Sequence, residues 1–476
     1  MVFSSSLFMF YFLPIVLIAY FFIDPKFKNH LLLLASLFFY SWGETKALVL
    51  IIISLILNFF LGLIIDSKRA NKWFCKGTFI VAIVLNIGIL VFYKYLGFIF
   101  DIALSVINIF PHQNTLNLSF SIPLPIGISF YTFHILSYII DVYKNKAPVQ
   151  KNIIDHGLYI FFFPQLIAGP IIRYNDIVDQ LKNRNSTLDD VIYGAKRFII
   201  GFSKKVLIAN NAGLIADNIF NSNLATLPQG ISWIGIFAYT VQIYYDFSAY
   251  SDMAIGLARI FGFRFKENFN YPYYADSVQD FWRRWHISLS RWFKDYVYIP
   301  LGGNRKGIFQ THFNKMVVFI LCGLWHGASW NFLFWGFYYG VFLTVEGLFL
   351  GKILSKTWKP LRHIYTWLVV MVGWVFFRTE TMNEALIYLK KMFWFNGTPF
   401  YSYIDIFKFW DKETMVLGIL ALLFCFPIYH SIERRLQNKN WRFLKPFGYL
   451  GLYLVFLISL LYLVNSSYNP FIYFRF

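Results

Sequence analysis

His326 is the residue of this sequence with the clearest potential for chemistry, because it lies in an otherwise apolar stretch, GLWHGASWNFLFWG (323–336). An ionisable residue inside a membrane segment is costly and is a functional candidate by default. A neutral imidazole can take a proton from a hydroxyl group, as transfer of an acyl group to an alcohol requires. The alternative is structural: His326 would bond a backbone carbonyl freed by the neighbouring glycines.

A second histidine, His286, lies in DFWRRWHISLSRWFKDYVYIPLGGNRKG (280–307), where basic and aromatic residues alternate. This segment is too charged to cross lipid, so we expect it to lie at the interface or to line a wet funnel into the protein. The residues expected to line the funnel or bind a donor are Trp282, Arg283, Trp285, Arg291, Lys294, Asn304 and Arg305. The alternative is that His286 is a solvated or structural residue.

Two carboxylates, Asp246 and Asp252, lie in YYDFSAYSD (244–252), in or near another apolar run. On a helix Asp246 faces Tyr250 one turn on, so it has a hydroxyl group nearby, and Ser248 faces Asp252 in the same way. The carboxylates could orient a catalytic imidazole, relay protons or hold helices together, and the last use is the commonest. Two further residues, Trp325 and Trp330, are expected to support the site around His326.

The sequence predicts neither a metal site nor a nucleotide-binding loop. No HxxxH or HExxH spacing occurs, and the three cysteines, Cys75, Cys322 and Cys425, form no CxxC pair. The glycine-rich stretch LGGNRKG (301–307) lacks the GxxxxGK[ST] pattern. It would either meet the phosphates of a coenzyme or carrier prosthetic group, or be an ordinary basic loop.

The composition places these residues in an integral membrane protein. Hydrophobic residues make up 58% of the chain and charged residues 14%, against about 25% charged residues in soluble proteins. About eleven to twelve segments approach the length that crosses hydrocarbon. The net charge of +19 is concentrated in short loops, so we expect contact with lipid and none with nucleic acid.

The basic loops predict how the chain crosses the membrane. Lys and Arg are frequent in 66–76, 144–151, 352–362 and 433–445, and absent from 101–122. The positive-inside rule places the basic loops in the cytoplasm, and the alternation of spans then places both termini outside it. No Lys or Arg precedes the first apolar run, which favours a retained span over a cleaved signal peptide.

Four segments depart from simple spans. Pro164 and Gly169 break 153–172, which is predicted to enter and leave on one side, and 193–220 carries basic pairs that suit a partly interfacial helix. The run 316–350 is predicted to be a broken or paired helix with His326 at the break. The segment 379–413 should lie outside but contains lysines, so we expect an amphipathic surface helix there.

These ordered motifs resemble the membrane-bound O-acyltransferase superfamily, specifically its bacterial branch of alginate and peptidoglycan O-acetyltransferases. The D-alanyl-lipoteichoic-acid transfer protein is a more distant relative. The stretches that carry the resemblance are FFPQLIAGPIIRY (162–174), YYDFSAYSDMAIG (244–256), ENFNYPY (267–273), 280–307, 323–336 and PFIYFRF (470–476). The resemblance covers the whole chain, so we expect one membrane domain over 1–476.

The resemblance implies an all-α cone of about eleven to twelve tilted and re-entrant helices around a central funnel. It implies transfer of an acyl group, most simply acetyl, from acetyl-CoA or an acyl carrier protein in the cytoplasm, with no permanently bound cofactor. His326 matches the family's near-invariant histidine and would act as general base or hydrogen-bond donor, and His286 matches a second, less uniform position.

The resemblance also implies a bacterial cytoplasmic-membrane enzyme that serves an extracytoplasmic cell-wall or exopolysaccharide. The acceptor would be the polysaccharide itself or an extracytoplasmic partner transferase of the SGNH type. If the tail 470–476 lies outside, Tyr473 could fold back to the funnel mouth as a transient acyl acceptor; the alternative is an aromatic membrane anchor. A transporter with a His/Asp proton relay is the competing function, although no inverted repeat is visible.

Overall fold

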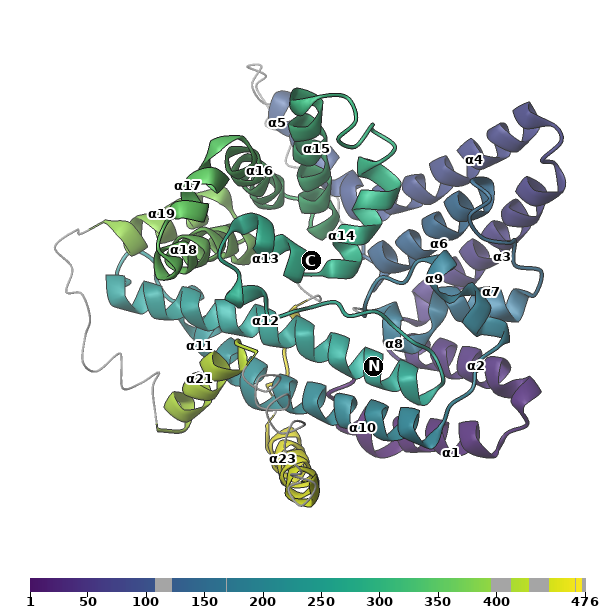
Figure 1. Ribbon diagram of the computed structural model, residues 1–476, viewed down its shortest axis with the longest axis horizontal. Helices are drawn as coiled ribbons and strands as arrows, with labels where there is room; N and C mark the ends of the chain where they lie inside the picture. The colour runs from purple at the N-terminus through teal and green to yellow at the C-terminus, as the bar shows by residue number, and fades with distance from the viewer. Residues whose placement is uncertain (108–121, 168, 395–411, 428–444, 467, 473–476) are drawn as a thin grey trace.

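The chain folds into helices joined by loops, and the part of it that is described contains no strand (Figure 1). This computed structural model describes residues 1–107, 122–167, 169–394, 412–427, 445–466 and 468–472. The short helices α13 and α14 lie near the middle of the view in Figure 1, with longer helices around them. The prediction of an all-α polytopic membrane protein is confirmed.

The described residues up to Lys182 form nine α-helices. They are α1 (Leu13–Phe22), α2 (Lys28–Ser41), α3 (Thr45–Ser67), α4 (Lys72–Leu90), α5 (Leu96–Ile107), α6 (Ile128–Tyr143), α7 (Ile153–Phe161), α8 (Phe163–Leu166) and α9 (Tyr174–Lys182). A π-helical turn, Phe8–Phe12, leads into α1, and another, Val91–Tyr95, joins α4 to α5 without a break.

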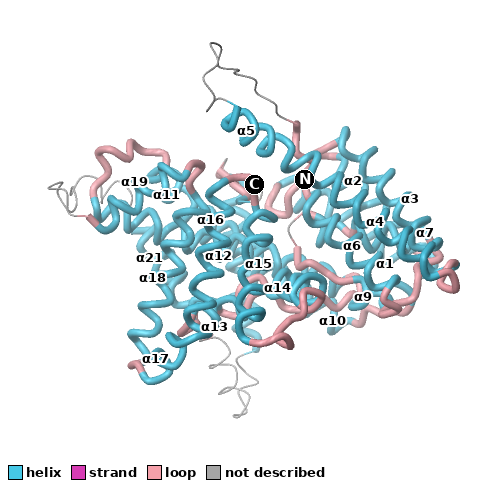
Figure 2. The backbone as a smooth tube through the Cα atoms, turned by 90° about the horizontal axis from the view of Figure 1, so that it is seen from above, coloured by secondary structure: helices cyan, strands magenta, loops and turns pink. Residues whose placement is uncertain are grey.

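The middle and C-terminal parts supply the remaining described helices. They are α10 (Leu188–Ser203), α11 (Asn210–Phe220), α12 (Gln229–Ile260), α13 (Val278–Arg284), α14 (Ile287–Phe293), α15 (Ile308–His326), α16 (Trp330–Val345), α17 (Gly351–Lys356), α18 (Lys359–Arg378), α19 (Met382–Phe393), α21 (Lys412–Phe424) and α23 (Lys445–Asn465). Figure 2, viewed at right angles, shows α5 extending away from the other helices.

Seven helices of the described part are long and apolar enough to cross a membrane. They are Thr45–Ser67, Lys72–Ile107, Leu188–Phe220, Ile308–His326, Trp330–Lys356, Lys359–Arg378 and Pro446–Asn465. The expected total of about eleven to twelve was counted from apolar length alone. Some of the apolar runs form shorter helices instead, such as Phe8–Phe22 and Met415–Phe424.

The segment 153–172 is broken, as expected. It forms α7 and the single turn α8, followed by chain without helical structure around Pro170. Backbone groups freed by the break bind inside the protein: the Phe163 N–H donates to Ser36 Oγ at 3.0 Å, and the Gln165 amide donates to the Tyr159 carbonyl. Such compensation is what permits irregular backbone at membrane depth.

The segment 193–220, predicted to be a partly interfacial helix, lies within one long helix of the structure. Leu188–Phe220 is continuous and is one of the seven candidate spans, and it packs along α12. Its basic side chains meet carboxylates of α12: Lys205 Nζ lies 2.7 Å from Asp246 and Lys204 Nζ lies 2.7 Å from Asp252. Arg197, Lys204 and Lys205 are therefore bound by carboxylates of α12.

The run 316–350 is a pair of helices that reverses direction just after His326. Both helices reach full length because α15 begins earlier than the apolar run, at Ile308, and α16 continues through Glu346–Leu350 into α17. The 19 residues of α15 span about 28 Å along the helix axis, which is close to the thickness of a bilayer core. His326 thus lies at the opposite end of α15 from the basic loop 301–307.

The amphipathic helix expected within 379–413 is present as α19. Its apolar residues Ala385, Tyr388 and Met392 are buried, and the Tyr388 hydroxyl donates to the Ser232 carbonyl of α12 at 2.7 Å. Lys391 donates to the Ala225 carbonyl at 2.7 Å. The helix therefore packs on the end of α12 instead of lying alone on a membrane surface, and 395–411 lies outside the described residues.

Candidate active site

The last turn of α15 positions His326, and all four of its carbonyls have partners. A helix end leaves four carbonyls without partners inside the helix. Here Gly323 O accepts from the Gly327 N–H at 3.2 Å and Leu324 O accepts from the Tyr95 hydroxyl at 2.7 Å. Lys94 donates to the other two, at 2.5 Å to the Trp325 carbonyl and 3.2 Å to the His326 carbonyl.

The His326 imidazole is therefore not needed to bond a freed carbonyl, which was the structural alternative. It is 6% exposed and lies among the rings of Trp325, Trp335 and Phe377, with centroids 4.9, 5.2 and 5.0 Å away. Its Nδ1 atom has no hydrogen-bond partner among the described residues. A buried polar atom without a partner calls for an explanation, and a ligand or reacting group supplies one.

A cavity of about 300 Å³ reaches His326. Its walls come from the end of α15, from Lys94, from the chain entering α6 and from Glu44; they are lined by Glu44, Lys94, Leu124, Pro125, Ile126, Gly127, Ile128, Ser129, Phe130, Ile167, Trp325 and His326. The volume is at the lower end of the range for small-molecule sites, about 300–1,000 Å³. The cavity can therefore hold a short acyl group together with the hydroxyl group that receives it.

His286 lies at the joint between α13 and α14, and its ring centroid is 6.1 Å from that of Trp325. Its backbone is left-handed, with φ of 43°, which a non-glycine residue adopts at an energetic cost. Burial lowers the pKa of His286 to about 3, so the imidazole is neutral at physiological pH. Since Trp325 contacts both imidazoles, the fold brings together the two histidines singled out in the sequence.

The loop ENFNYPY (267–273) holds α14 in this position. Asn268 Oδ1 accepts hydrogen bonds from the backbone N–H and the hydroxyl of Ser288, at 3.1 and 2.8 Å. The Asn268 amide donates to Ser251 of α12 at 3.0 Å, and its carbonyl accepts from the Ile287 N–H at 2.9 Å. One asparagine therefore joins the start of α14, and with it His286, to the long helix α12.

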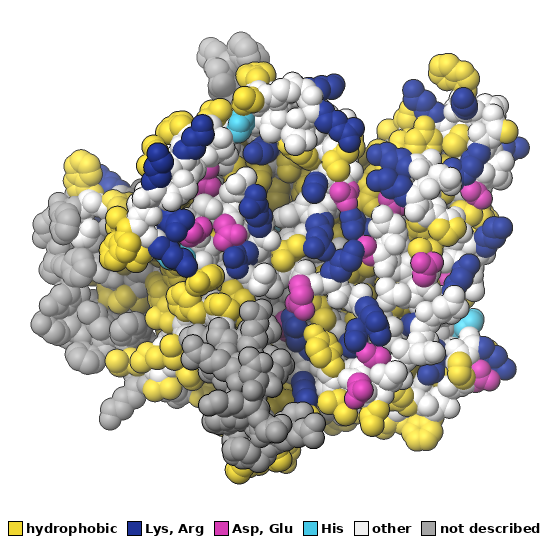
Figure 3. All heavy atoms as spheres, in the orientation of Figure 1, with side chains coloured by type: hydrophobic (Ala, Val, Ile, Leu, Met, Phe, Trp, Pro, Cys, Tyr) yellow, Lys and Arg dark blue, Asp and Glu magenta, His cyan; other side chains and the backbone are white. Residues whose placement is uncertain are grey.

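The expected funnel residues divide into a buried aromatic set and an exposed polar set. Trp282 and Trp285 are buried against α16 and α18, with Trp282 4.9 Å from Tyr339 and Trp285 5.0 Å from Trp374. The polar residues are exposed; they are Arg283, Arg291, Lys294, Asn304 and Arg305. Lys and Arg side chains are frequent on the face of the molecule seen in Figure 3.

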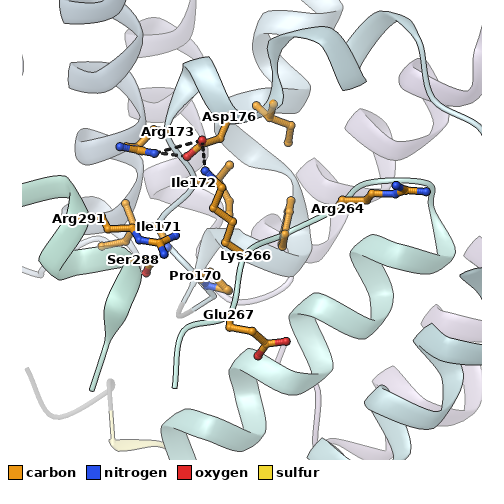
Figure 4. A pocket seen from close by; sticks show the side chains of 12 residues that line it. Pro170, Ile171, Ile172, Arg173, Asp176, Arg264, Lys266, Glu267, Ser288 and Arg291 are labelled. Carbon is orange, nitrogen blue, oxygen red and sulfur yellow. Dashed lines mark hydrogen bonds and ion pairs between the residues drawn. The ribbon is translucent and has the colours of Figure 1, made fainter. Parts of the chain in front are cut away.

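A small pocket on α14 contains part of this basic set (Figure 4). Arg291 and Ser288 of α14 line it together with Arg173, Asp176, Arg264 and Lys266. Burial alone would raise the pKa of Asp176, but its contacts with Arg173 and Lys266 outweigh burial and lower the pKa. The Asp176 carboxylate thus stays ionised and binds the Arg173 and Lys266 side chains. The Arg291 side chain is exposed and could contact an anionic group.

The carboxylates Asp246 and Asp252 hold helices together. Asp246 pairs with Lys205, and Asp252 pairs with Arg197 and Lys204 at 2.7 Å each. Asp246 was expected from helix spacing to meet the Tyr250 hydroxyl, but it pairs with Lys205 instead. The Tyr250 ring stacks on that of Phe3, with centroids 4.4 Å apart. Of the three uses considered for these carboxylates, their contacts show the commonest, which is to hold helices together.

The C-terminal segment enters the protein beside this ion pair. Tyr468 donates to Asp217 at 2.6 Å, the Asn469 amide donates to the Ser4 carbonyl at 2.6 Å, and the Pro470 carbonyl accepts from Lys205. The Ile472 N–H donates to Asp246 Oδ2 at 3.0 Å. The chain is thus anchored up to the residue before Tyr473, which itself lies outside the described residues.

The close approach of α15 and α16 depends on glycines, and we expect Gly323→Ala to inactivate the protein. A Cβ atom at Gly323 would collide with the Phe332 carbonyl of α16, whose backbone cannot yield easily. A shift of about 1 Å at a reacting group can cost about 10²-fold in rate. Transfer rates per folded protein would measure the effect. Gly340→Ala is the control, because its Cβ meets the flexible end of Met316, and equal losses in both variants would contradict the prediction.

Lys94 is the residue of the site that our sequence reasoning missed, and a signal for it was present. It is a lysine inside the apolar run 77–100, and an ionisable residue in a membrane segment is a functional candidate by default. The expected supporting residue Trp325 is buried beside both histidines, whereas Trp330 is 56% exposed and contacts Phe98.

Comparison with known proteins agrees with this arrangement. A model of the membrane-bound O-acyltransferase family matches residues 37–383. The probable alginate O-acetylase AlgI of Pseudomonas aeruginosa is 41% identical over 92% of this chain and 84% of its own. The peptidoglycan O-acetyltransferase of Helicobacter pylori is 36% identical over 83% and 80%. The teichoic acid D-alanyltransferase of Bacillus subtilis is more distant, at 28% over 53% and 66%. The chain therefore belongs to the membrane-bound O-acyltransferase family and is an acyltransferase.

Proposed function

We propose that this protein transfers an acetyl group from a thioester on the cytoplasmic side to a hydroxyl group that enters from outside. The observation that carries the proposal is that His326 is among the residues lining a cavity, while Lys94 and Tyr95 bind the backbone carbonyls of the same helix end. The imidazole is thus not engaged by these carbonyls, and two of the relatives are named as an alginate O-acetylase and a peptidoglycan O-acetyltransferase.

In the proposed reaction, the acceptor oxygen attacks the thioester carbonyl carbon. His326 takes the hydroxyl proton as the C–O bond forms. When the C–S bond then breaks, the proton passes to the departing thiolate, so that an ester and a free thiol are produced. His286, which is neutral and in contact with Trp325, would help to orient the thioester.

The donor would approach from the side of the basic loops. The positive-inside rule places these loops in the cytoplasm, and both termini outside it. Exposed Arg291, Lys294, Asn304 and Arg305 offer charges and donors to the phosphates of acetyl-CoA or of an acyl carrier protein. From the same segment, the buried ring of Trp282 lies 5.5 Å from that of Trp335, which in turn lies 5.2 Å from the His326 ring.

The acceptor would be an extracytoplasmic cell-wall or exopolysaccharide, reached directly or through an SGNH-type partner transferase. The names of the relatives support a polymer of this kind, since they specify alginate and peptidoglycan. His326 and the cavity that it lines lie at the end of α15 opposite the basic loop 301–307, which suits a hydroxyl group that arrives from outside.

The competing function, a transporter with a proton relay, has less support. A relay requires titratable groups within reach of one another across the membrane. Asp246 and Asp252 instead pair with lysine and arginine side chains on the neighbouring helix.

Purified protein in detergent tests the proposal directly. With radiolabelled acetyl-CoA and, separately, an acetylated acyl carrier protein, we expect thioester turnover that yields free thiol. The donor that supports turnover identifies the class of donor. Absence of turnover with both donors, also after addition of a membrane extract that supplies partner proteins, would contradict the proposal.

We further propose that Tyr473 is a transient acyl acceptor, since the anchored chain ends one residue before it. Tyr473→Phe should then abolish the labelled acyl-tyrosine. It should also lower transfer to polysaccharide at least about tenfold, because the hydroxyl group that forms the covalent acyl intermediate is lost. Mass spectrometry of the C-terminal peptide would measure acylation. Full transfer activity in Tyr473→Phe would reject this role, and Tyr468→Phe is the matched control for loss of a tail hydroxyl.

A further inference from the structure

Lys94 is a charged residue of the site that the proposed reaction does not use. It lies in a candidate membrane span, where an ammonium group is costly unless it has partners. Its Nζ atom donates to the carbonyls of Trp325 and His326 and, at 3.2 Å, to the hydroxyl of Ser129. An ammonium group has three N–H donors, so these three acceptors use all of them.

The local backbone directs Lys94 to this position. Val91–Tyr95 forms a π-helical turn inside the span, a rare feature that is frequent at functional sites. Within this turn two consecutive residues, Lys94 and Tyr95, both bind carbonyls of the last turn of α15. The turn thus presents two donors to a single helix end.

A lysine suits this helix end better than a neutral donor would. The carbonyl end of a helix carries partial negative charge, which a cation stabilises, and the effect is strongest where water is excluded. Lys94 satisfies two carbonyls at once and also binds Ser129 of α6. It therefore connects the end of α15 to α6 along the wall of the cavity that His326 also lines.

We propose that Lys94 is a positioning residue for acyl transfer, which fixes the last turn of α15 and so holds the His326 imidazole against the cavity. The role rests on the proposed function, because it acts through His326. Lys94 does not contact the reacting atoms in this scheme, since its three donors are already engaged.

The test compares Lys94→Met, Lys94→Arg and Tyr95→Phe with the wild type, all full-length and purified in detergent. Methionine keeps the length and loses the charge, arginine keeps the charge, and Tyr95→Phe removes one uncharged donor to the same helix end. Size-exclusion chromatography and thermal unfolding establish the folded fraction. Acetyl transfer gives kcat and KM per folded protein, and hydrogen exchange over 323–328 reports on the helix end without any need for activity.

We expect Lys94→Met to lower kcat about 10- to 100-fold with little change in the KM for the donor, as loss of orientation predicts. Exchange over 323–328 should become faster in the same variant. Lys94→Arg should recover much of both quantities, and Tyr95→Phe should change each less than Lys94→Met does. A purely structural role would reduce the folded fraction and leave kcat per folded protein unchanged.

The proposal is overturned if Lys94→Met keeps either the wild-type kcat or the wild-type exchange over 323–328. A wild type that transfers no acetyl group, together with an equally inactive His326→Ala, overturns the proposed function by itself. In that case faster exchange in Lys94→Met still supports the fixing of the helix end by Lys94, and unchanged exchange rejects it. The two failures are therefore distinguishable.

Discussion

His326→Ala should abolish acyl transfer while the protein stays folded. Loss of a general base or acid typically costs about 10²–10⁴-fold in rate, and His326 is the histidine among the residues that line the cavity. The fold should survive, because the carbonyls of the helix end are bound by Lys94, Tyr95 and Gly327 rather than by the His326 ring. The measurement is transfer of radiolabelled acetyl groups by protein whose elution profile matches that of the wild type.

A second histidine variant makes this result specific. His363 is half-buried on α18, where its ring nitrogen lies 2.9 Å from the Ala275 carbonyl, and it does not line the cavity. His363→Ala should therefore keep most of the activity. Equal rates for the wild type and a well-folded His326→Ala would remove His326 from the mechanism.

Asp246→Ala should cause the largest loss of stability among the substitutions considered. The Asp246 and Lys205 side chains are 1% and 4% exposed and lie 2.7 Å apart, and Asp246 also accepts from the Ile472 N–H. Removal of one partner from a buried ion pair typically costs about 3–5 kcal/mol in the free energy of unfolding, because the other charge is left buried and uncompensated. Unfolding in mixed micelles would measure the loss.

The double variant Lys205→Met/Asp246→Leu separates the charge effect from the loss of packing. With neither charge present, much of the stability should return, as it does when apolar residues replace whole buried pairs. Asp252→Ala offers a further comparison, since its partners Arg197 and Lys204 are 24% and 27% exposed and can reach water. If Asp246→Ala lowers the free energy of unfolding no more than Asp252→Ala does, burial does not determine the strength of these ion pairs.

Several features of the protein were determined by the sequence alone. Apolar length and the scarcity of charge required helices in a membrane, because backbone groups in lipid must be satisfied within the chain. Glycines at 323 and 327 marked the helix end beside His326, and Pro164 and Gly169 marked the break in the segment 153–172. These are local signals: each depends on residue types within a few positions of one another, and so a linear pattern can reveal them.

The tertiary structure alone decided which of these residues meet. Lys94 reaches carbonyls more than two hundred positions away, Asp246 selects Lys205 over its neighbour Tyr250, and Trp325 contacts both His286 and His326. Lys204 and Lys205, which suggested a membrane surface, form ion pairs with Asp252 and Asp246 because the helix Leu188–Phe220 packs on α12. The physical reason is that a buried charge or carbonyl takes whichever partner the packing of helices brings within hydrogen-bond distance, and spacing along one helix does not contain that information.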